Sequence, residues 1–191
     1  APQRANSFIE FSAIGDKLTY RNWYRRLEGA NVVTNDPFAF TGNFSIEFKF
    51  RGTASPEGAL LRKAALLGEM VHYELLLRAD RKLVFKLGTN ELESYVAIPD
   101  DETWVHVAAV VSGRKMQLTL TWKETEEAES YLEYSVDIDW AGTMPQSAGT
   151  DVVVGGGNFI GDVDDLRLWN IARSAALIRA DRDTDWAAGS L

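Results

Sequence analysis

The chain has 191 residues, of which 46% are hydrophobic and 11% are aromatic. This composition allows one substantial core, and a chain of this length is commonly one domain, so we expect a single domain over residues 1–191. The formal net charge of −8 argues against a nucleic-acid backbone or an anionic membrane surface as the main partner. It permits divalent cations or neutral glycans.

The chain contains no cysteine, which excludes a disulfide framework and a thiolate metal site and leaves the redox compartment open. No apolar run in the sequence reaches the length of a transmembrane helix. We therefore expect a chain that is not inserted into a membrane.

Two short strands are predicted near the start of the chain, over residues 8–11 and 17–20, with a turn between them. Residues 23–29 follow with aromatic and arginine side chains but no regular period, which suits a loop that contacts a ligand. The alternative is that Trp23 lies at the edge of the core and the arginines are solvated.

Alternation of apolar and polar residues over 44–51 predicts the most secure strand. Residues 58–67 fit a short helix as well as two strands flanking a bend, and we favour a strand for the second half. Alternation over 71–77 and 83–87, with a turn at 79–81, predicts an antiparallel hairpin.

Residues 104–111 are largely apolar on both faces, which predicts a central strand that includes Trp104 and His106. The chain has two histidines, His72 and His106, and each lies within a predicted strand without a convincing nucleophile partner. Both are therefore predicted to be structural.

A second hairpin is predicted from the alternation over 116–122 and 132–138. The acidic segment 123–130 between them is interpreted as a solvated hairpin tip, with a cation or partner site as the alternative. A brief buried strand at 152–154 leads into the glycine cluster 155–157. A nucleotide loop is not expected there, because no Gly-Lys-Ser/Thr follows.

A half-buried strand is predicted over residues 161–170, because aliphatic side chains alternate there with polar and aromatic ones. Ser174 is a suitable N-cap for a short helix in which Leu177 and Ile178 pack back on the sheet. Three carboxylates of one sign stand at the start of the strand and need compensation by water, backbone amides or a cation: Asp162, Asp164 and Asp165.

About a dozen short strands with short connections and one short C-terminal helix predict an all-β fold, a two-sheet antiparallel β-sandwich. Three stretches carry a resemblance in the expected order: 42–48, 103–113 and 161–174. Together they resemble the laminin-G-like (pentraxin-like) jelly-roll domain of the concanavalin A-like lectin/glucanase superfamily. The resemblance implies jelly-roll topology with one concave sheet.

The resemblance also implies a calcium ion that pins the N-terminal turn to the closing strand. The matching positions are Asp16 with Asp164 or Asp165, and such an ion would be structural. The alternative is that these aspartates cap turns or pair with Arg167 and Arg173.

No catalytic activity is expected from the sequence. The Glu-x-Asp-x-x-Glu spacing of the jelly-roll endoglucanases does not occur in the chain, and neither do the clusters of arginine, glutamine or histidine, and tyrosine of the lyases with this fold. A carbohydrate-binding, lectin-like module is therefore the leading prediction. The alternative is a non-catalytic structural or protein-interaction module of a larger assembly.

Glycan sites combine aromatic rings, on which sugar C–H faces stack, with polar side chains that bond hydroxyl pairs. We expect such a site in loops at one rim of the sandwich, in a chain that self-associates for avidity. A secreted or extracellular location is favoured, and a cytosolic one stays open. The candidate ligand-binding residues are Trp23, Tyr24, Arg25, Trp122, Trp140 and Asn158.

Overall fold

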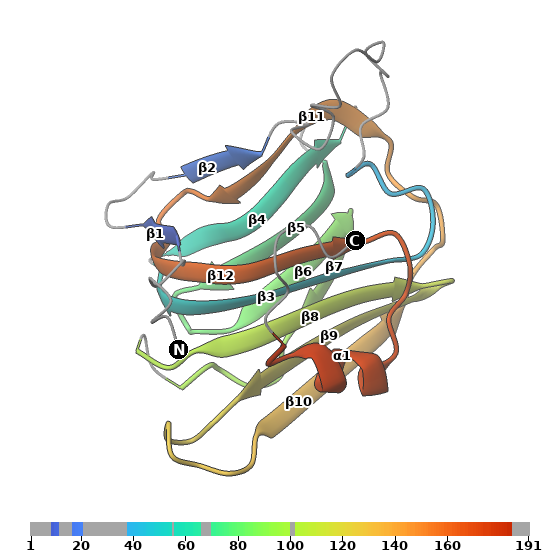
Figure 1. Cartoon of the computed structure of the whole chain (residues 1–191). Helices are drawn as coiled ribbons and strands as arrows, with labels where there is room; N and C mark the ends of the chain where they lie inside the picture. The colour runs from blue at the N-terminus through green and yellow to red at the C-terminus, as the bar shows by residue number, and fades with distance from the viewer. Residues whose placement is uncertain are drawn as a thin grey trace, which may run out of the picture.

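The computed structural model describes residues 38–54, 56–65, 70–99 and 102–184, without the side chains of 148–151, and the backbone of two further short strands. These are β1 (Ile9–Phe11) and β2 (Lys17–Tyr20). The described residues form two antiparallel sheets that lie face to face, with one helix outside them (Figure 1). The predicted all-β sandwich with a short C-terminal helix is confirmed.

The first sheet, sheet A, has six strands in the order β1-β12-β3-β8-β9-β10. Its remaining members are β3 (Phe44–Thr53), β8 (Val105–Ser112), β9 (Lys115–Trp122), β10 (Leu132–Asp139) and β12 (Ile160–Trp169). The order places the closing strand β12 beside β3, although the two are more than 100 residues apart in the sequence.

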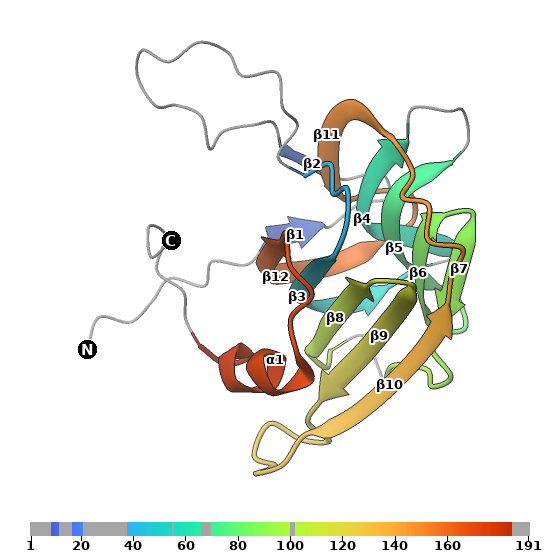
Figure 2. The same ribbon diagram turned by 90° about the vertical axis from the view of Figure 1, so that its right-hand side faces the viewer.

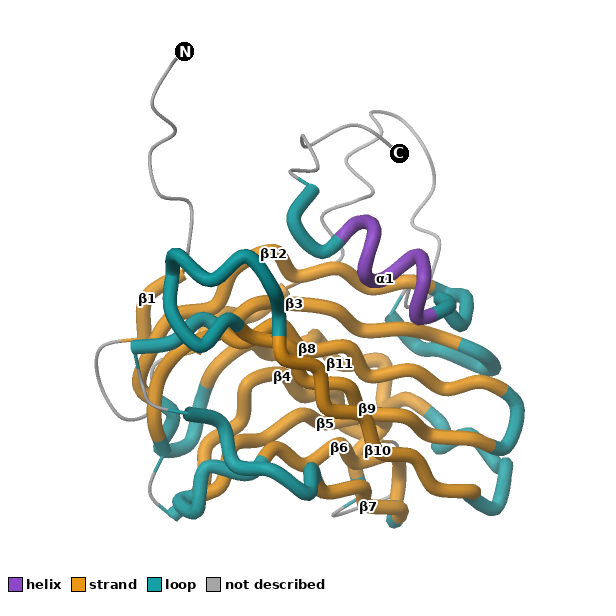
Figure 3. The backbone as a smooth tube through the Cα atoms, turned by 90° about the horizontal axis from the view of Figure 1, so that it is seen from below, coloured by secondary structure: helices purple, strands orange, loops and turns teal. Residues whose placement is uncertain are grey.

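The second sheet, sheet B, has six strands in the order β2-β11-β4-β5-β6-β7. Its remaining members are β4 (Glu57–Ala65), β5 (Val71–Arg78), β6 (Leu83–Gly88), β7 (Asn90–Glu93) and β11 (Ser147–Gly155). The helix α1 (Ala175–Asp181) lies against sheet A on the side away from sheet B (Figures 2 and 3). The described residues include no helix long and apolar enough to span a membrane.

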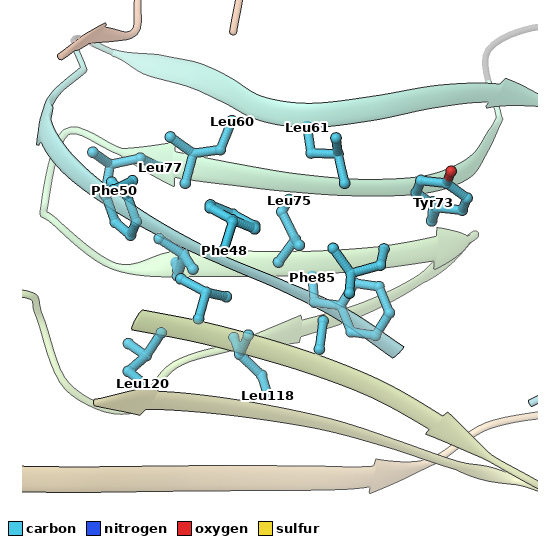
Figure 4. Close-up of a cluster of buried hydrophobic side chains, with 14 of the residues drawn as sticks. Phe48, Phe50, Leu60, Leu61, Tyr73, Leu75, Leu77, Phe85, Leu118 and Leu120 are labelled. Atoms are coloured by element: carbon cyan, nitrogen blue, oxygen red, sulfur yellow. The ribbon is translucent and has the colours of Figure 1, made fainter. Parts of the chain in front are cut away.

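The main core lies between the sheets and is formed by alternate side chains of each strand. Phe44, Ile46, Phe48 and Phe50 of β3 are all fully or almost fully buried. They pack against Tyr73, Leu75 and Leu77 of β5, Phe85 of β6, and Leu118 and Leu120 of β9 (Figure 4). The period of two that predicted these strands also assigns the intervening side chains to the outer faces.

Two glycines allow β3 and β12 to approach closely. Gly52 and Gly161 are paired and have φ angles of 143° and 155°. A Cβ atom on Gly161 would stand 2.1 Å from the carbonyl oxygen of Arg51. This contact brings the start of β12, with its carboxylates, directly beside the end of β3.

Several boundaries differ from the sequence-based predictions. Residues 57–65 form one strand with bulges, so neither a helix nor a bend occurs there. Strand β11 is longer than the predicted 152–154, and β7 was not predicted. Trp104 stands just before β8 and is half-buried, beneath the Arg51 guanidinium at 4.9 Å, so its placement within the strand was wrong.

Candidate functional site

The outer face of sheet B carries a row of alternating charges that runs across four neighbouring strands. The strand register pairs Arg62 of β4 with Glu74 of β5, Glu74 with Lys86 of β6, and Lys86 with Glu91 of β7. We call these four residues the charge ladder. The neighbouring residues of β5, Tyr73 and Leu75, point into the core, so the ladder lies on the opposite side.

Glu74 stands at the centre of the ladder, and its side chain is only 10% exposed. Its two carboxylate oxygens lie 3.8 Å from Arg62 Nε and 3.9 Å from Lys86 Nζ, which is longer than a hydrogen bond. Among the described residues, Glu74 accepts no side-chain hydrogen bond. Burial raises the pKa of Glu74 and is opposed by the nearby charges of Arg62 and Lys86. Glu74 is thus a largely desolvated carboxylate in two long ion pairs, without a side-chain hydrogen bond from the described residues.

A second group of charges continues the same face towards the β5–β6 turn. Arg78 donates to both Glu91 and Glu93, and Lys82 Nζ donates to Glu93 at 3.0 Å. Lys86 lies 3.8 Å from Glu91 and so connects this group to the ladder. These side chains are about one-third exposed, so they hold fixed donors and acceptors at the surface.

An apolar row lies beside the ladder on the same face. Leu76 is paired with Val84 and with Ala59 in the strand register. Leu76 and Val84 are buried although they do not belong to the core between the sheets. The methylene stems of the long charged side chains on either side can cover this row.

An exposed aromatic ring marks the end of β7. Tyr95 is 61% exposed and follows Glu93 by two residues. Its ring meets Tyr134 of β10 edge to face at 6.0 Å, and Tyr134 stacks on Trp122 at 4.8 Å. The Tyr95 ring therefore packs on Tyr134 and keeps an exposed aromatic face two residues beyond Glu93.

Two of the predicted ligand-binding residues are in the core. Trp122 and Trp140 are each 6% exposed, and the Trp140 indole N–H donates to the carbonyl oxygen of Gly113 at 3.1 Å. Neither ring is presented to solvent as a stacking surface, so their assignment to an exposed site was wrong. Alternation placed Trp122 at a strand end and did not reach Trp140, and it does not show whether a ring at such a position is covered by the core.

The other predicted ligand-binding residues have mixed outcomes. Trp23, Tyr24 and Arg25 lie outside the described residues. Asn158 is half-buried, and its side-chain amide donates to the carbonyl oxygen of Glu57 at 3.1 Å. Glu57 begins β4 and is paired with Arg78, so Asn158 stands at one end of sheet B and stays a candidate.

Two of the three carboxylates at the start of β12 are paired with cations of the chain itself. Asp165 lies 2.9 Å from Arg167 and 3.7 Å from Lys49, and Asp162 bonds Arg51 at 2.7 Å. Asp164 Oδ1 accepts the backbone N–H of Asp165, which has a φ of 58° beside a bulge. Asp165 thus pairs with Arg167, as the alternative interpretation expected.

Asp16, the third predicted calcium ligand, lies outside the described residues. Within the described ranges, no group of three or more potential metal-binding side chains occurs. A calcium ion held by Asp16 and Asp164 stays a prediction.

The buried charged residues of sheet A pair with one another and attach α1 to the sheet. Glu47 on the outer face of β3 bonds Arg173 and lies 3.8 Å from His106, all three under α1. Burial and the cations Arg182, Lys49 and Arg167 lower the pKa of His106 to about 3, so its imidazole is neutral in ordinary solution.

Comparison with known proteins defines the class to which this arrangement belongs. A model of the family Laminin_G_3, described as the concanavalin A-like lectin/glucanases superfamily, matches residues 27–179. The chain belongs to this family. Its fold is therefore that of a lectin-like jelly roll, as its resemblance indicated. No curated protein matches the chain.

Two solved structures illustrate the likeness. The chain is similar to the CBM40 module of Ruminococcus gnavus IT-sialidase, with a TM-score of 0.62 and 11% identity over 91% of this chain and 95% of that one. The same module bound to α2,6 sialyllactose gives a TM-score of 0.61. Trypanosoma rangeli sialidase in complex with sialic acid gives 0.60 and 14% identity, over 95% of this chain but 29% of the sialidase. Identities this low show a shared fold alone.

Proposed function

We propose that this chain is a non-catalytic carbohydrate-binding module that holds a glycan on the outer face of sheet B. The observation that carries the proposal is the desolvated Glu74 carboxylate, which accepts no side-chain hydrogen bond from the described residues and is flanked by Arg62 and Lys86. Neighbouring hydroxyls of a sugar ring are both donors and acceptors, so a carboxylate set between two cations complements them.

Tyr95 supplies the apolar part of the proposed site. A sugar that bonds the charged side chains of β5, β6 and β7 can place a C–H face against this exposed ring. This location differs from the predicted rim loops because most of the contacts come from strands. Strand residues are held by the sheet, so binding requires little ordering of the protein.

The fold of the CBM40 module supports the same class of function, since that protein has been seen bound to sialyllactose. The whole Trypanosoma rangeli sialidase is much longer than this chain, which spans 29% of it. Hydrolytic activity is therefore not part of the proposal.

A glycan array with labelled protein, followed by calorimetric titration of each retained sugar, tests the proposal. We expect saturable binding that Glu74→Gln weakens by roughly 10-fold to 100-fold, the range for a hydrogen bond to a charged group. Asp137→Asn is the matched control, because it removes one carboxylate from an exposed ion pair with Lys115 on sheet A. Retention of no glycan would contradict the proposal and favour a structural or protein-interaction module.

A further inference from the structure

The cations on the outer face of sheet B are already matched by carboxylates of the chain. Lys82 bonds Glu93, and Arg78 bonds both Glu91 and Glu93. Lys86 lies within 4 Å of both Glu74 and Glu91. Each of the described cations named on this face therefore has at least one carboxylate within 4 Å.

Arg62 is the more exposed of the two ladder cations, at 49% against 27% for Lys86, and it has one ladder carboxylate within 4 Å where Lys86 has two. Its Nε nevertheless lies 3.8 Å from the Glu74 carboxylate. A ligand carboxylate that paired with Arg62 would stand close to Glu74 in a partly desolvated setting, where like charges are poorly screened.

The central group of the ladder, Glu74, is a carboxylate and therefore an acceptor, and its two ion-pair distances are longer than hydrogen bonds. Glu74 carries no side-chain hydrogen bond from the described residues, and its low exposure keeps water from screening its charge. An acceptor of this kind takes a hydroxyl or amide donor from the ligand and repels an acidic group. The formal net charge of −8 adds a long-range repulsion of the same sign.

From this arrangement we infer that the outer face of sheet B selects uncharged sugars over acidic ones, with Glu74 as the residue that rejects the acid. The inference rests on the proposed glycan-binding function and specifies its ligand class. It assigns to this chain a preference different from the sialylated ligand of the CBM40 structure, with which it shares a fold at 11% identity. Discrimination by repulsion is a common way to obtain specificity where attractive contacts are similar.

The test uses an array of matched glycan pairs that differ only in a terminal acidic group, such as a neutral galactoside with its sialylated or sulfated form. We expect the wild-type chain to retain the neutral member of a pair and to bind the acidic member at least about 10-fold more weakly. In Glu74→Gln, affinity for the neutral member falls, and the ratio of acidic to neutral binding rises by about 10-fold or more.

Asp137→Asn changes the net charge of the chain by the same amount as Glu74→Gln but lies on sheet A. It should leave the acidic-to-neutral ratio as in the wild type. Preferential retention of the acidic glycans would overturn the inference, and so would an equal change of the acidic-to-neutral ratio in the two variants. Either result would leave the glycan-binding function in place. Retention of no glycan at all would overturn the glycan-binding function and the inference with it.

Discussion

Arg173 and Glu47 form an ion pair of 2.7 Å between side chains that are 4% and 0% exposed. Glu47 lies on the outer face of β3, and Arg173 precedes α1, so the pair fastens the helix to sheet A. Ser45 strengthens the attachment, since its hydroxyl accepts the Arg173 backbone N–H at 2.8 Å and donates to the Ile171 carbonyl oxygen. Arg173 also bonds Asp181 at the end of the helix.

Removing one member of this pair should strongly destabilise the chain. Arg173→Met leaves the Glu47 carboxylate buried without its partner, a change that typically costs about 3–5 kcal/mol. Chemical denaturation monitored by circular dichroism measures the loss. The double variant Arg173→Met with Glu47→Leu should recover most of it, because no buried charge remains. Equal losses in the single and double variants would contradict this account of the pair.

His106 should make stability fall in mild acid. Its pKa is about 3 in the folded chain and near 6.5 when unfolded, so between these values only the unfolded chain takes up the proton. The contribution is fully present above pH 6.5 and is lost as pH falls, at about 1.4 kcal/mol per pH unit. Denaturation at several pH values should show a shallower dependence in His106→Gln. A His106 imidazole that titrates near pH 6.5 by NMR would contradict the prediction.

Glu74→Gln should separate binding from stability. Burial raises the pKa of Glu74, so the folded chain holds the charged form unfavourably, and stability rises as pH falls through the range above 4.5. A neutral glutamine removes the unfavourable buried charge, so the melting temperature at neutral pH should equal or exceed that of the wild type. A large drop in melting temperature would mean that Glu74 is a structural residue.

Tyr95 and Trp122 should respond in opposite ways to truncation. Tyr95→Ala removes a ring that is 61% exposed, so it should weaken glycan binding several-fold and leave the melting temperature almost unchanged. Trp122→Ala opens a cavity in the core and should cost about 3–5 kcal/mol of stability. Full affinity in Tyr95→Ala would exclude the ring from the site.

The carboxylates of β12 provide a test for calcium. Because Asp165 pairs with Arg167 and Lys49, Asp165→Asn should lower the melting temperature by the same amount in calcium and in chelator. If calcium binds through Asp16 and Asp164, the wild-type chain should melt higher with calcium, and Asp164→Asn should abolish the rise. A wild-type melting temperature that does not change with calcium would contradict the predicted calcium site.

The architecture could be predicted from alternation because burial imposes a period of two on each strand. Phe44 to Phe50 on β3 and Met116 to Trp122 on β9 follow it closely. The Ser174 N-cap was also predicted, and its hydroxyl accepts the Leu177 N–H. Leu177 itself was wrongly expected to pack on the sheet, since it is 51% exposed and Ile178 alone of the two is buried.

The candidate site could not be predicted in the same way. The charge ladder joins residues of β4, β5, β6 and β7 that lie side by side only through strand register, and register is not visible in a single sequence. The sequence did not identify Tyr95 either, because a single exposed tyrosine in a loop belongs to no periodic pattern. Tryptophans were favoured as ligand residues for their chemistry, yet Trp122 and Trp140 are needed by the core.

The most direct test of the central claim is to map the bound glycan on the chain by NMR. Backbone amide shifts are recorded while the best-retained sugar from the array is titrated into uniformly labelled protein. The account predicts saturable shifts concentrated on β4, β5, β6, β7 and the residues around Tyr95, including Tyr134, with α1 and the 123–130 tip unchanged. Shifts centred elsewhere, or no saturable shift with any sugar on the array, would contradict it.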